Sequence, residues 1–557
     1  MRQHKLATKL YYRDIALVSI TVIFYIYLNL HHFECAKEIT GYLVMGDLSM
    51  LKVTMSTSIW CFTFFSFASY YYLDKLCFDS LEECAQSLCN GAKKIYFNQI
   101  FVLFVLAFII TLTLTAYNIY AYWKLEIHHI EVLKHMLYCI LLYILGVSLA
   151  GIGLGLLVAL KLKRLSACSL IALVVFISTP IFLRFVEILY YSFDLNVFPL
   201  YEFIYIFPRG LTTMPQHSVG YSLLPDRIAV MLFWLSSLYL ISFLHIFVRE
   251  KTNQIIMTFV GIAICCASLF VYLAPGTKTL TANNPKGDFA IDRMYYLFGY
   301  TPKEEPASFE ITSYDMELTI NDQLEAEVVA EIDTPDLEIY HFTLYHGYKV
   351  SEIRNQEGNK LTYEQNGDYI EVLRGANRIT SLIFTYVGFN PTYYSYSQGI
   401  LLPGHFAFYP RCGYQEIYDT KEQGFYNCLL QKPVNFSVKV NYQKEVYCNL
   451  SKIGKNYFAG VSDGCTILAG FLTSKTIENV EVVFPYLDTE QFGHGFLESD
   501  LRKFFEIKSD DNVVNKIMIL PYVNMGTHAR CNYYEDGTIV CVQIRTLGND
   551  YFRKQSG

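Results

Sequence analysis

Charged side chains are scarce in this sequence. Only 17% of its 557 residues are Asp, Glu, Lys or Arg, whereas a soluble domain carries about a quarter. Hydrophobic residues make up 53%, and the mean hydropathy is +0.26. The protein is therefore not wholly soluble, and the composition also excludes collagen, coiled coil and disorder. The formal net charge of −7 offers no global basic surface to nucleic acid.

Two catalytic motifs are also missing from the sequence. It has no G-x-x-x-x-G-K-[ST] phosphate loop and no H-E-x-x-H zinc motif. We therefore predict no catalytic residue, no metal ligand and no cofactor. The later histidines, His341, His346, His405, His494 and His528, are expected to be surface or core residues. Five positions separate His341 from His346, which predicts opposite faces of one strand.

The chain consists of two unlike halves. Residues 1–275 hold 19 basic and 15 acidic residues, whereas residues 276–557 hold 25 and 36, which together give the totals of 44 and 51. The first half contains seven apolar runs long enough to span a bilayer, which takes about 20 residues each. They lie at 15–31, 51–73, 98–122, 136–160, 165–183, 228–248 and 255–274. We expect an uncleaved seven-helix membrane bundle over 1–275 and a juxtamembrane linker over 276–305.

Basic residues predict the orientation of this bundle. Twelve of them fall in alternate loops: Arg2, Lys5, Lys9, Arg13, Lys75, Lys93, Lys94, Lys161, Lys163, Arg164, Arg249 and Lys251. The opposite loops carry fewer: Lys37, Lys124, Lys134, Arg209 and Arg227. We expect a multi-pass protein of the cell membrane with a cytoplasmic N-terminus. Seven spans would then place residues 276–557 outside the cytoplasm.

Three local features of the membrane half suggest contacts. The cytoplasmic loop 74–97 has the period of a short helix over 81–88, and Glu82, Glu83, Gln86 and Ser87 are candidates for docking a cytoplasmic partner; a plain solvated connector is the alternative. Gly151 and Gly155 form a G-x-x-x-G pair, which allows close helix packing within the bundle or at a dimer seam. Arg184 and Glu187 are spaced to pair on one helix. We expect almost no other ionisable group within the spans.

This arrangement resembles the permease subunits of type-two ABC exporters. The resemblance covers about 250 residues and rests on the cytoplasmic N-terminus and the segment containing Glu82, Glu83, Ser87, Leu88 and Lys93 between the second and third spans; where such permeases often have proline, this chain has Cys89. It implies a separate ATPase subunit as a partner, because this chain lacks the phosphate loop. A homo- or hetero-dimer in the membrane is the accompanying expectation.

The second half alternates apolar and polar residues as strands do. We expect an all-β domain over 306–488, followed by a short α/β segment over 489–557 with a helix near 498–506. The stretches ITSYDMELTI, SLIFTYVG at 381–388, LLPGHFAFYP at 401–410 and FSVKVNYQKEVYCNLS at 436–451 resemble the N-terminal β domain of the aminopeptidase N family of zinc peptidases. The sequence reaches Gly557 without that family's H-E-x-x-H, and MGTHAR offers His528 where the family has a substrate-binding acid. No catalytic group carries over.

Six cysteines lie in the second half: Cys412, Cys428, Cys448, Cys465, Cys531 and Cys541. An even number in an extracytoplasmic domain allows three disulfides and fifteen connectivities, and six thiols are the alternative. Cys531 and Cys541 are symmetric about Asp536, so a hairpin would place them opposite each other.

These features lead to one preferred function and two alternatives. The preferred one is a non-ATPase, permease-like subunit of a bacterial ABC-type exporter, with an outward, non-catalytic, peptidase-derived domain that binds a peptide or another extracytoplasmic ligand. The first alternative is a truncated or split membrane-anchored aminopeptidase-like hydrolase. The second is a membrane-anchored sensor or adhesion protein.

Overall fold

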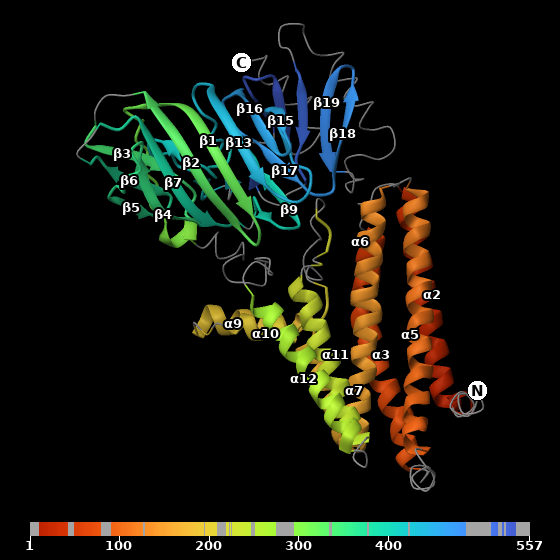
Figure 1. Ribbon diagram of the computed structural model, residues 1–557. Helices are drawn as coiled ribbons and strands as arrows, with labels where there is room; N and C mark the ends of the chain where they lie inside the picture. The colour runs from red at the N-terminus through yellow and green to blue at the C-terminus, as the bar shows by residue number, and fades with distance from the viewer. Residues whose placement is uncertain are drawn as a thin grey trace. The chain divides into compact units, whose positions relative to one another are not determined.

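The structure is a computed structural model. It describes residues 11–42, 49–78, 91–125, 129–193, 195, 197–208, 219–221, 223, 225–246, 251–274, 295–333, 337–375, 378–390, 392–421, 424–485, 514–521, 526–527 and 531–541. The chain divides into two compact units. One comprises residues 1–215 and 220–278, and the other comprises 216–219 and 279–557. The first is helical and the second is built of sheets, as expected for the two halves (Figure 1).

Eleven helical segments are described in the first unit. They are α2 (Ile15–Tyr42), α3 (Ser49–Phe78), α5 (Gly91–Lys124), α6 (Ile130–Ile140), the π-helical η1 (Leu141–Gly146), α7 (Val147–Lys161), α8 (Arg164–Ile177), α9 (Pro180–Phe193), α10 (Phe198–Ile204), α11 (Pro225–Ile246) and α12 (Lys251–Leu273). Within the described residues, five are long and apolar enough to cross a membrane: α2, α5, the continuous α6–η1–α7, α11 and α12. Counting the bent pair α8–α9 gives six.

The predicted count of seven spans is therefore not confirmed, and α3 is the helix that differs. It contains the run 51–73, but it also carries buried hydroxyl side chains such as Thr54, Ser58 and Ser69. These hydroxyl residues lower its mean hydropathy, and their side chains are buried within the helical unit. The run is a helix, as predicted, but its polar side faces neighbouring helices.

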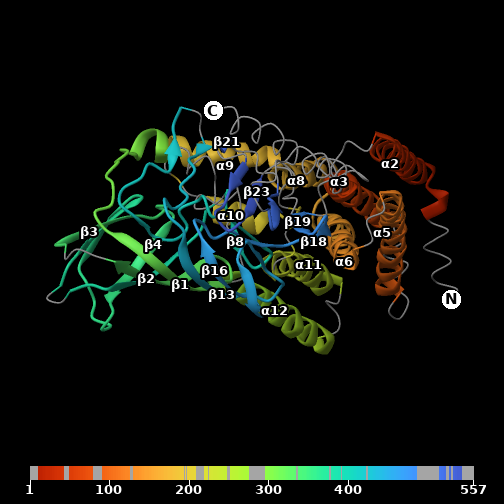
Figure 2. The ribbon, with the colours of Figure 1, turned by 90° about the horizontal axis from the view of Figure 1, so that it is seen from above.

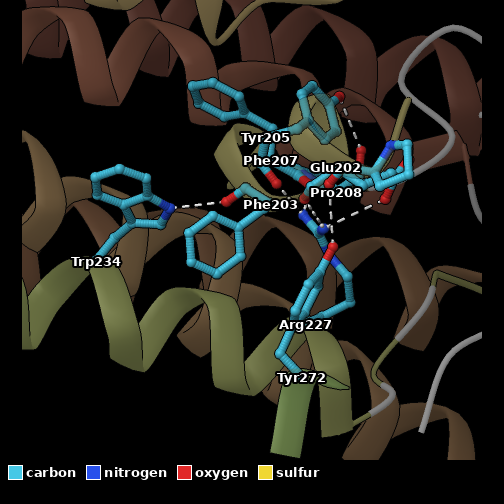
Figure 3. Close-up of polar contacts among 9 residues, drawn as sticks. Glu202, Phe203, Tyr205, Phe207, Pro208, Arg227, Trp234 and Tyr272 are labelled. Atoms are coloured by element: carbon cyan, nitrogen blue, oxygen red, sulfur yellow. Dashed lines mark hydrogen bonds and ion pairs between the residues drawn. The ribbon is translucent and has the colours of Figure 1, made fainter. Parts of the chain in front are cut away.

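The run 165–183 is the second departure from the prediction. A straight span was expected there, whereas α8 and α9 are bent by 63°. The bend lies just before Pro180, which has no N–H for the helix ladder and disfavours helical geometry in the residue before it. The chain then enters the short helix α10, whose backbone contacts side chains of α11 (Figure 3).

The second unit contains a seven-stranded sheet in the order β15-β16-β13-β1-β2-β7-β4, whose central members are labelled in Figure 2. Its strands are β1 (Glu310–Ile320), β2 (Leu324–Asp333), β4 (Tyr348–Asn355), β7 (Ser381–Gly388), β13 (Val434–Asn441), β15 (Ser451–Gly454) and β16 (Tyr457–Ser462). Met316 and Leu318 of β1 are buried while Asp315 and Glu317 are exposed. This alternation places one face of the sheet on the core.

Four smaller sheets complete the described strands. Two of them have four strands each: one is β10 (Arg411–Cys412), β3 (Ile339–Thr343), β6 (Tyr369–Leu373) and β5 (Tyr363–Asn366), and the other is β14 (Tyr447–Cys448), β17 (Ile467–Ala469), β9 (Gly399–Leu402) and β8 (Ser395–Tyr396). The three-stranded sheet contains β11 (Tyr418–Asp419), β12 (Gly424–Phe425) and β21 (Gly526–Thr527). The five-stranded sheet contains β18 (Leu472–Ile477), β19 (Val480–Pro485), β20 (Lys516–Ile519), β23 (Thr538–Cys541) and β22 (Cys531–Tyr533). A π-helical turn, η2 (Tyr295–Gly299), precedes them.

The five-stranded sheet crosses the expected boundary at residue 488. Strands β18 and β19 come from the predicted all-β domain, and β20, β22 and β23 come from the predicted α/β segment, yet β19 and β20 pair in parallel. These two stretches therefore share one sheet. The predicted helix at 498–506 lies outside the described residues.

Candidate functional site

The strongest candidate site is a buried polar cluster around Arg227 in the helical unit (Figure 3). Arg227 stands in the first turn of α11, and its Nη2 donates hydrogen bonds to the carbonyl oxygens of Tyr205 at 2.5 Å and Phe207 at 2.8 Å. Its Nη1 donates to the carbonyl oxygen of Glu202 at 3.4 Å. The last carbonyls of a helix have no partner within that helix. Arg227 supplies a partner for the Glu202 carbonyl near the end of α10 and for two carbonyls just beyond it.

Two aromatic side chains bond two further carbonyls of this segment. Trp234 of α11 donates from Nε1 to the carbonyl oxygen of Phe203 at 2.8 Å. The Tyr272 hydroxyl, on α12, donates to the carbonyl oxygen of Pro199 at 3.3 Å. Non-helical backbone in apolar surroundings is tolerated only where such partners are present. Three side chains from two long helices therefore fix α10 and the residues that follow it (Figure 3).

Charge is also buried in this cluster. Arg227 is 2% exposed, Glu202 is 6% exposed, and Asp226 is fully buried. The Arg227 Nη1 lies 3.8 Å from the Glu202 Oε2, and its guanidinium lies 5.8 Å from the centre of the Tyr205 ring. Removing charges from water is costly unless they are paired and hydrogen-bonded. Arg227 was expected in a loop between two spans, whereas the structure places it in the first turn of the apolar helix α11.

A second polar region joins α2, α3 and α5. The His32 Nδ1 contacts the carbonyl oxygen of Leu28 at 2.9 Å, and because a carbonyl only accepts, this nitrogen carries the proton. Its Nε2 lies 3.3 Å from the Thr57 Oγ1. The Asn118 Nδ2 donates to the Thr54 Oγ1 at 2.6 Å. His32, Thr54 and Asn118 are fully buried. We refer to these four side chains, His32, Thr54, Thr57 and Asn118, as the polar seam.

The other predicted contacts of the helical unit are distributed as follows. Gly151 and Gly155 face α3, where an added Cβ on Gly151 would lie 2.7 Å from the Phe62 carbonyl oxygen. Arg184 and Glu187 form an ion pair of 2.9 Å on α9. The docking candidates Glu82, Glu83, Gln86 and Ser87 lie outside the described residues.

The three described histidines of the β unit have separate environments. His341 lies on β3, stacked on Tyr414 and 3.2 Å from Glu305. His346 follows the end of that strand, so the expected opposite faces of one strand do not apply; its Nδ1 lies 3.1 Å from the Asp368 carboxylate. His405 is buried elsewhere. Within the described residues, no three His, Cys, Asp or Glu side chains cluster as metal ligands. His494 and His528 lie outside those residues.

His405 is held in one neutral tautomer. The Asn532 Nδ2 donates to its Nδ1 at 2.9 Å, and its Nε2 lies 3.2 Å from the Tyr393 hydroxyl. The Asn532 amide is itself oriented, because its Oδ1 accepts a hydrogen bond from the Asn427 Nδ2. Burial, followed by the nearby Arg411 guanidinium, lowers the pKa of His405 to about 3. This residue is a buried hydrogen-bonding group rather than an exposed base.

The β unit also contains a groove of about 560 Å³. Its lining includes Cys448, Asn449, Glu481, Lys516 and Asp536. The Lys516 Nζ donates to the Cys448 carbonyl oxygen at 2.9 Å and lies 3.2 Å from the Glu481 carboxylate. The Asn449 Nδ2 donates to the Asp536 carboxylate at 2.8 Å. The groove is therefore polar, and these charged groups are held by neighbours within its walls.

The predicted cysteine hairpin is present. Cys531 of β22 is paired in register with Cys541 of β23. Both side chains are reduced in the structure, so the disulfide stays a prediction. A second pair was not anticipated from the sequence: the Cys448 and Cys465 sulfur atoms are 3.9 Å apart.

Comparison with known proteins gives limited similarity. No family model and no curated protein matches the chain. Structural neighbours include leukotriene A4 hydrolase of yeast, with bestatin bound, at 12% identity and a TM-score of 0.30 over 42% of this chain and 40% of that one. Another is an M1 zinc metallopeptidase from Deinococcus radiodurans, at 15% identity and a TM-score of 0.30 over 43% of this chain and 61% of that one. This chain thus spans less than two thirds of either, and at these TM-scores no activity follows.

The charge cluster carried a weak sequence signal. Glu202 and Arg227 are 25 positions apart, and nothing in their spacing predicts that they meet. Proline at 199, 208 and 225 does mark a broken stretch between the apolar runs. Acidic and basic residues within such a stretch could have been read as partners for its unpaired backbone.

Proposed function

We propose that the chain is a permease-like membrane subunit of an exporter, that a separate cytoplasmic ATPase drives it, and that its β unit binds a ligand outside the cytoplasm without catalysing a reaction. The observation that carries the proposal is the buried Arg227 and Glu202 pair. Ionisable groups inside a membrane bundle are expensive and usually mark functional sites. A bundle that served only as an anchor would need neither this pair nor the broken segment it holds.

The polar seam supports the same role. His32 and Thr57 come from neighbouring helices, as do Asn118 and Thr54, so α2, α3 and α5 contact one another through polar groups. Such contacts can be exchanged when helices move, whereas an inert anchor is well served by apolar packing. The missing phosphate loop supports a separate ATPase.

Co-purification tests the partner. The native protein should bring down an ATPase subunit from its own membranes, and a variant with Glu82→Lys and Glu83→Lys should lose it while still inserting. The matched control carries Glu34→Lys and Glu38→Lys, which reverse the charge of two exposed acids near the C-terminal end of α2. Retention of the ATPase by the first variant, or its absence from the native preparation, would contradict the proposal and favour a simple anchor.

Cysteine labelling tests the orientation. A cysteine introduced at Glu357, in an exposed turn of the β unit, should react with an impermeant maleimide on intact cells. A cysteine at Lys161, which is exposed at the end of α7, should react only after lysis. Each cysteine is introduced alone, with unmodified protein as the background control. The reverse pattern would place the β unit in the cytoplasm and remove the proposed external ligand.

A further inference from the structure

We propose that Cys448 and Cys465 form a regulatory disulfide at the floor of the groove in the β unit. Their sulfur atoms lie 3.9 Å apart, in contact but not bonded. Cys448 ends β14, and Cys465 lies two residues before β17, the strand that pairs with β14. Cys448 is opposite Ile467 in that pairing, so the two thiols are diagonal neighbours across it.

Asn449 holds the two cysteine backbones in this position. Its Oδ1 accepts a hydrogen bond from the backbone N–H of Thr466 at 2.7 Å, and its Nδ2 donates to the carbonyl oxygen of Gly464 at 2.9 Å. These two residues flank Cys465, and Asn449 itself follows Cys448. The backbone on both sides of one cysteine is thus tied to the side chain next to the other. Closure requires the two sulfur atoms to approach from 3.9 Å to the bonded distance of about 2.0 Å.

The two thiols differ in access. Cys448 is 2% exposed and is part of the lining of the groove, whereas Cys465 is fully buried and is not part of that lining. The groove is large enough for the sulfur end of a small disulfide molecule. Cys448 is therefore the thiol that an external oxidant reaches first, and Cys465 is the thiol that resolves the product.

The reaction balances with a low-molecular-weight disulfide such as oxidised glutathione as the oxidant. The Cys448 thiol loses its proton and attacks one sulfur of the oxidant, which forms a mixed disulfide and releases one glutathione thiol. The Cys465 thiol then loses its proton and attacks the Cys448 sulfur, which releases the second glutathione. The protein loses two protons and two electrons, and the oxidant becomes two thiols.

The consequence falls on the groove. Asn449 and Lys516 both hold residues at its floor: Asn449 bonds to Asp536, and Lys516 bonds to the Cys448 carbonyl oxygen. A bridge to Cys465 would fix Cys448 relative to these groups. The redox state of the pair would then set the rigidity of the groove floor, which links ligand binding in the groove to the presence of the oxidant. This inference does not depend on the exporter proposal.

The test uses the purified full-length protein with oxidised glutathione, followed by alkylation, non-reducing digestion and mass spectrometry. We expect a peptide that links Cys448 to Cys465, and its loss on reduction. Cys465→Ser should leave Cys448 as a trapped glutathione adduct, whereas Cys448→Ser should leave Cys465 as a thiol. Cys428→Ser is the matched control, because Cys428 is a buried thiol of the same unit and should leave the linked peptide unchanged.

Two results would overturn the proposal. One is quantitative alkylation of both thiols after oxidation in protein whose elution and far-UV circular dichroism are native. The other is a linkage of Cys448 to any other cysteine. The two single variants also test the order of attack. If Cys448 in Cys465→Ser and Cys465 in Cys448→Ser form the glutathione adduct equally, Cys448 is not the thiol that reacts first. The test is made in solution, so it is independent of the orientation in the membrane.

Discussion

Cys531 lies directly opposite Cys541 across strands β22 and β23, at a position where neither residue bonds to the other through its backbone. The Tyr534 N–H donates to the Thr538 carbonyl oxygen at 2.8 Å, and hydrogen-bonded pairs alternate along an antiparallel ladder. The cysteines are three residues further out, which makes them a non-hydrogen-bonded pair with Cα atoms about 4.5 Å apart. That separation lies within the range that a disulfide accepts.

The first prediction is that this pair is bridged in protein made in an oxidising compartment. Closing a loop of about ten residues should add about 2–3 kcal/mol to the free energy of unfolding. Peptide mapping without reduction should recover the linkage, and Cys531→Ser with Cys541→Ser should lower the unfolding midpoint. Complete alkylation of both thiols in the native, oxidised protein would show that the pair is not bridged.

The two cysteine pairs show what a sequence can and cannot reveal. Cys531 and Cys541 are joined by one turn, so their symmetry about Asp536 was enough to predict the register. Cys448 and Cys465 meet only because β14 pairs with β17, and the intervening hairpin of β15 and β16 belongs to a different sheet. No local pattern encodes that pairing. Strand alternation predicts which residues are buried, but not which sheets share an edge.

The same limit applies to the helical unit. Apolar runs predicted its helices, because hydropathy depends on composition within a window. They did not predict that Arg227 turns inward, since its partners are backbone carbonyls of a segment about 20 residues away in sequence. The break before Pro180 was readable from proline chemistry. The path of the chain after that break was not.

The second prediction concerns Arg227. Arg227→Met should destabilise the helical unit by about 3–5 kcal/mol, because Glu202 would be left buried without its cation and the Tyr205 and Phe207 carbonyls would lose their donor. Thermal unfolding in detergent, followed by size-exclusion elution, measures the change. Arg184→Met is the matched control: the Arg184 side chain is 79% exposed in its ion pair with Glu187, so its loss should cost less than about 1 kcal/mol. Equal effects of the two changes would contradict the special role of Arg227.

The third prediction separates two glycines of α7. A Cβ on Gly155 would lie 2.7 Å from the Ser69 Cβ and the Tyr70 backbone nitrogen of α3, so α3 would have to shift. A Cβ on Gly153 would meet only side chains, the nearest being Leu238 and Tyr239 at 3.2 Å. Both alanine variants gain similar helix propensity. Gly155→Ala should therefore be less stable than Gly153→Ala by about 1–3 kcal/mol in thermal unfolding. Equal stabilities would mean that α3 and α7 are not in close contact.

The last prediction is an acid sensitivity of the β unit through His405. Its folded pKa of about 3 lies below the ordinary value of 6.5, so the unfolded chain takes up the proton more readily. The stability that this residue contributes is present above about pH 6.5 and is lost as the pH falls toward about 3. Between pH 7 and pH 5 the loss should be about 2 kcal/mol, because the unfolded state is protonated in that window and the folded state is not.

The geometry explains why the folded state refuses the proton. The His405 Nδ1 accepts from the Asn532 Nδ2, and the Asn427 Nδ2 on the Asn532 Oδ1 keeps that amide from turning round. A proton on Nδ1 would face another donor. Hydrogen exchange of the full-length protein, corrected for intrinsic rates, should show the loss in peptides that cover β9 and β22. His405→Gln, which cannot titrate, should remove this part of the pH dependence even if it lowers stability overall. If the stability of His405→Gln depends on pH as steeply as that of the native protein, other groups cause the acid sensitivity, because residue 405 no longer titrates in this variant.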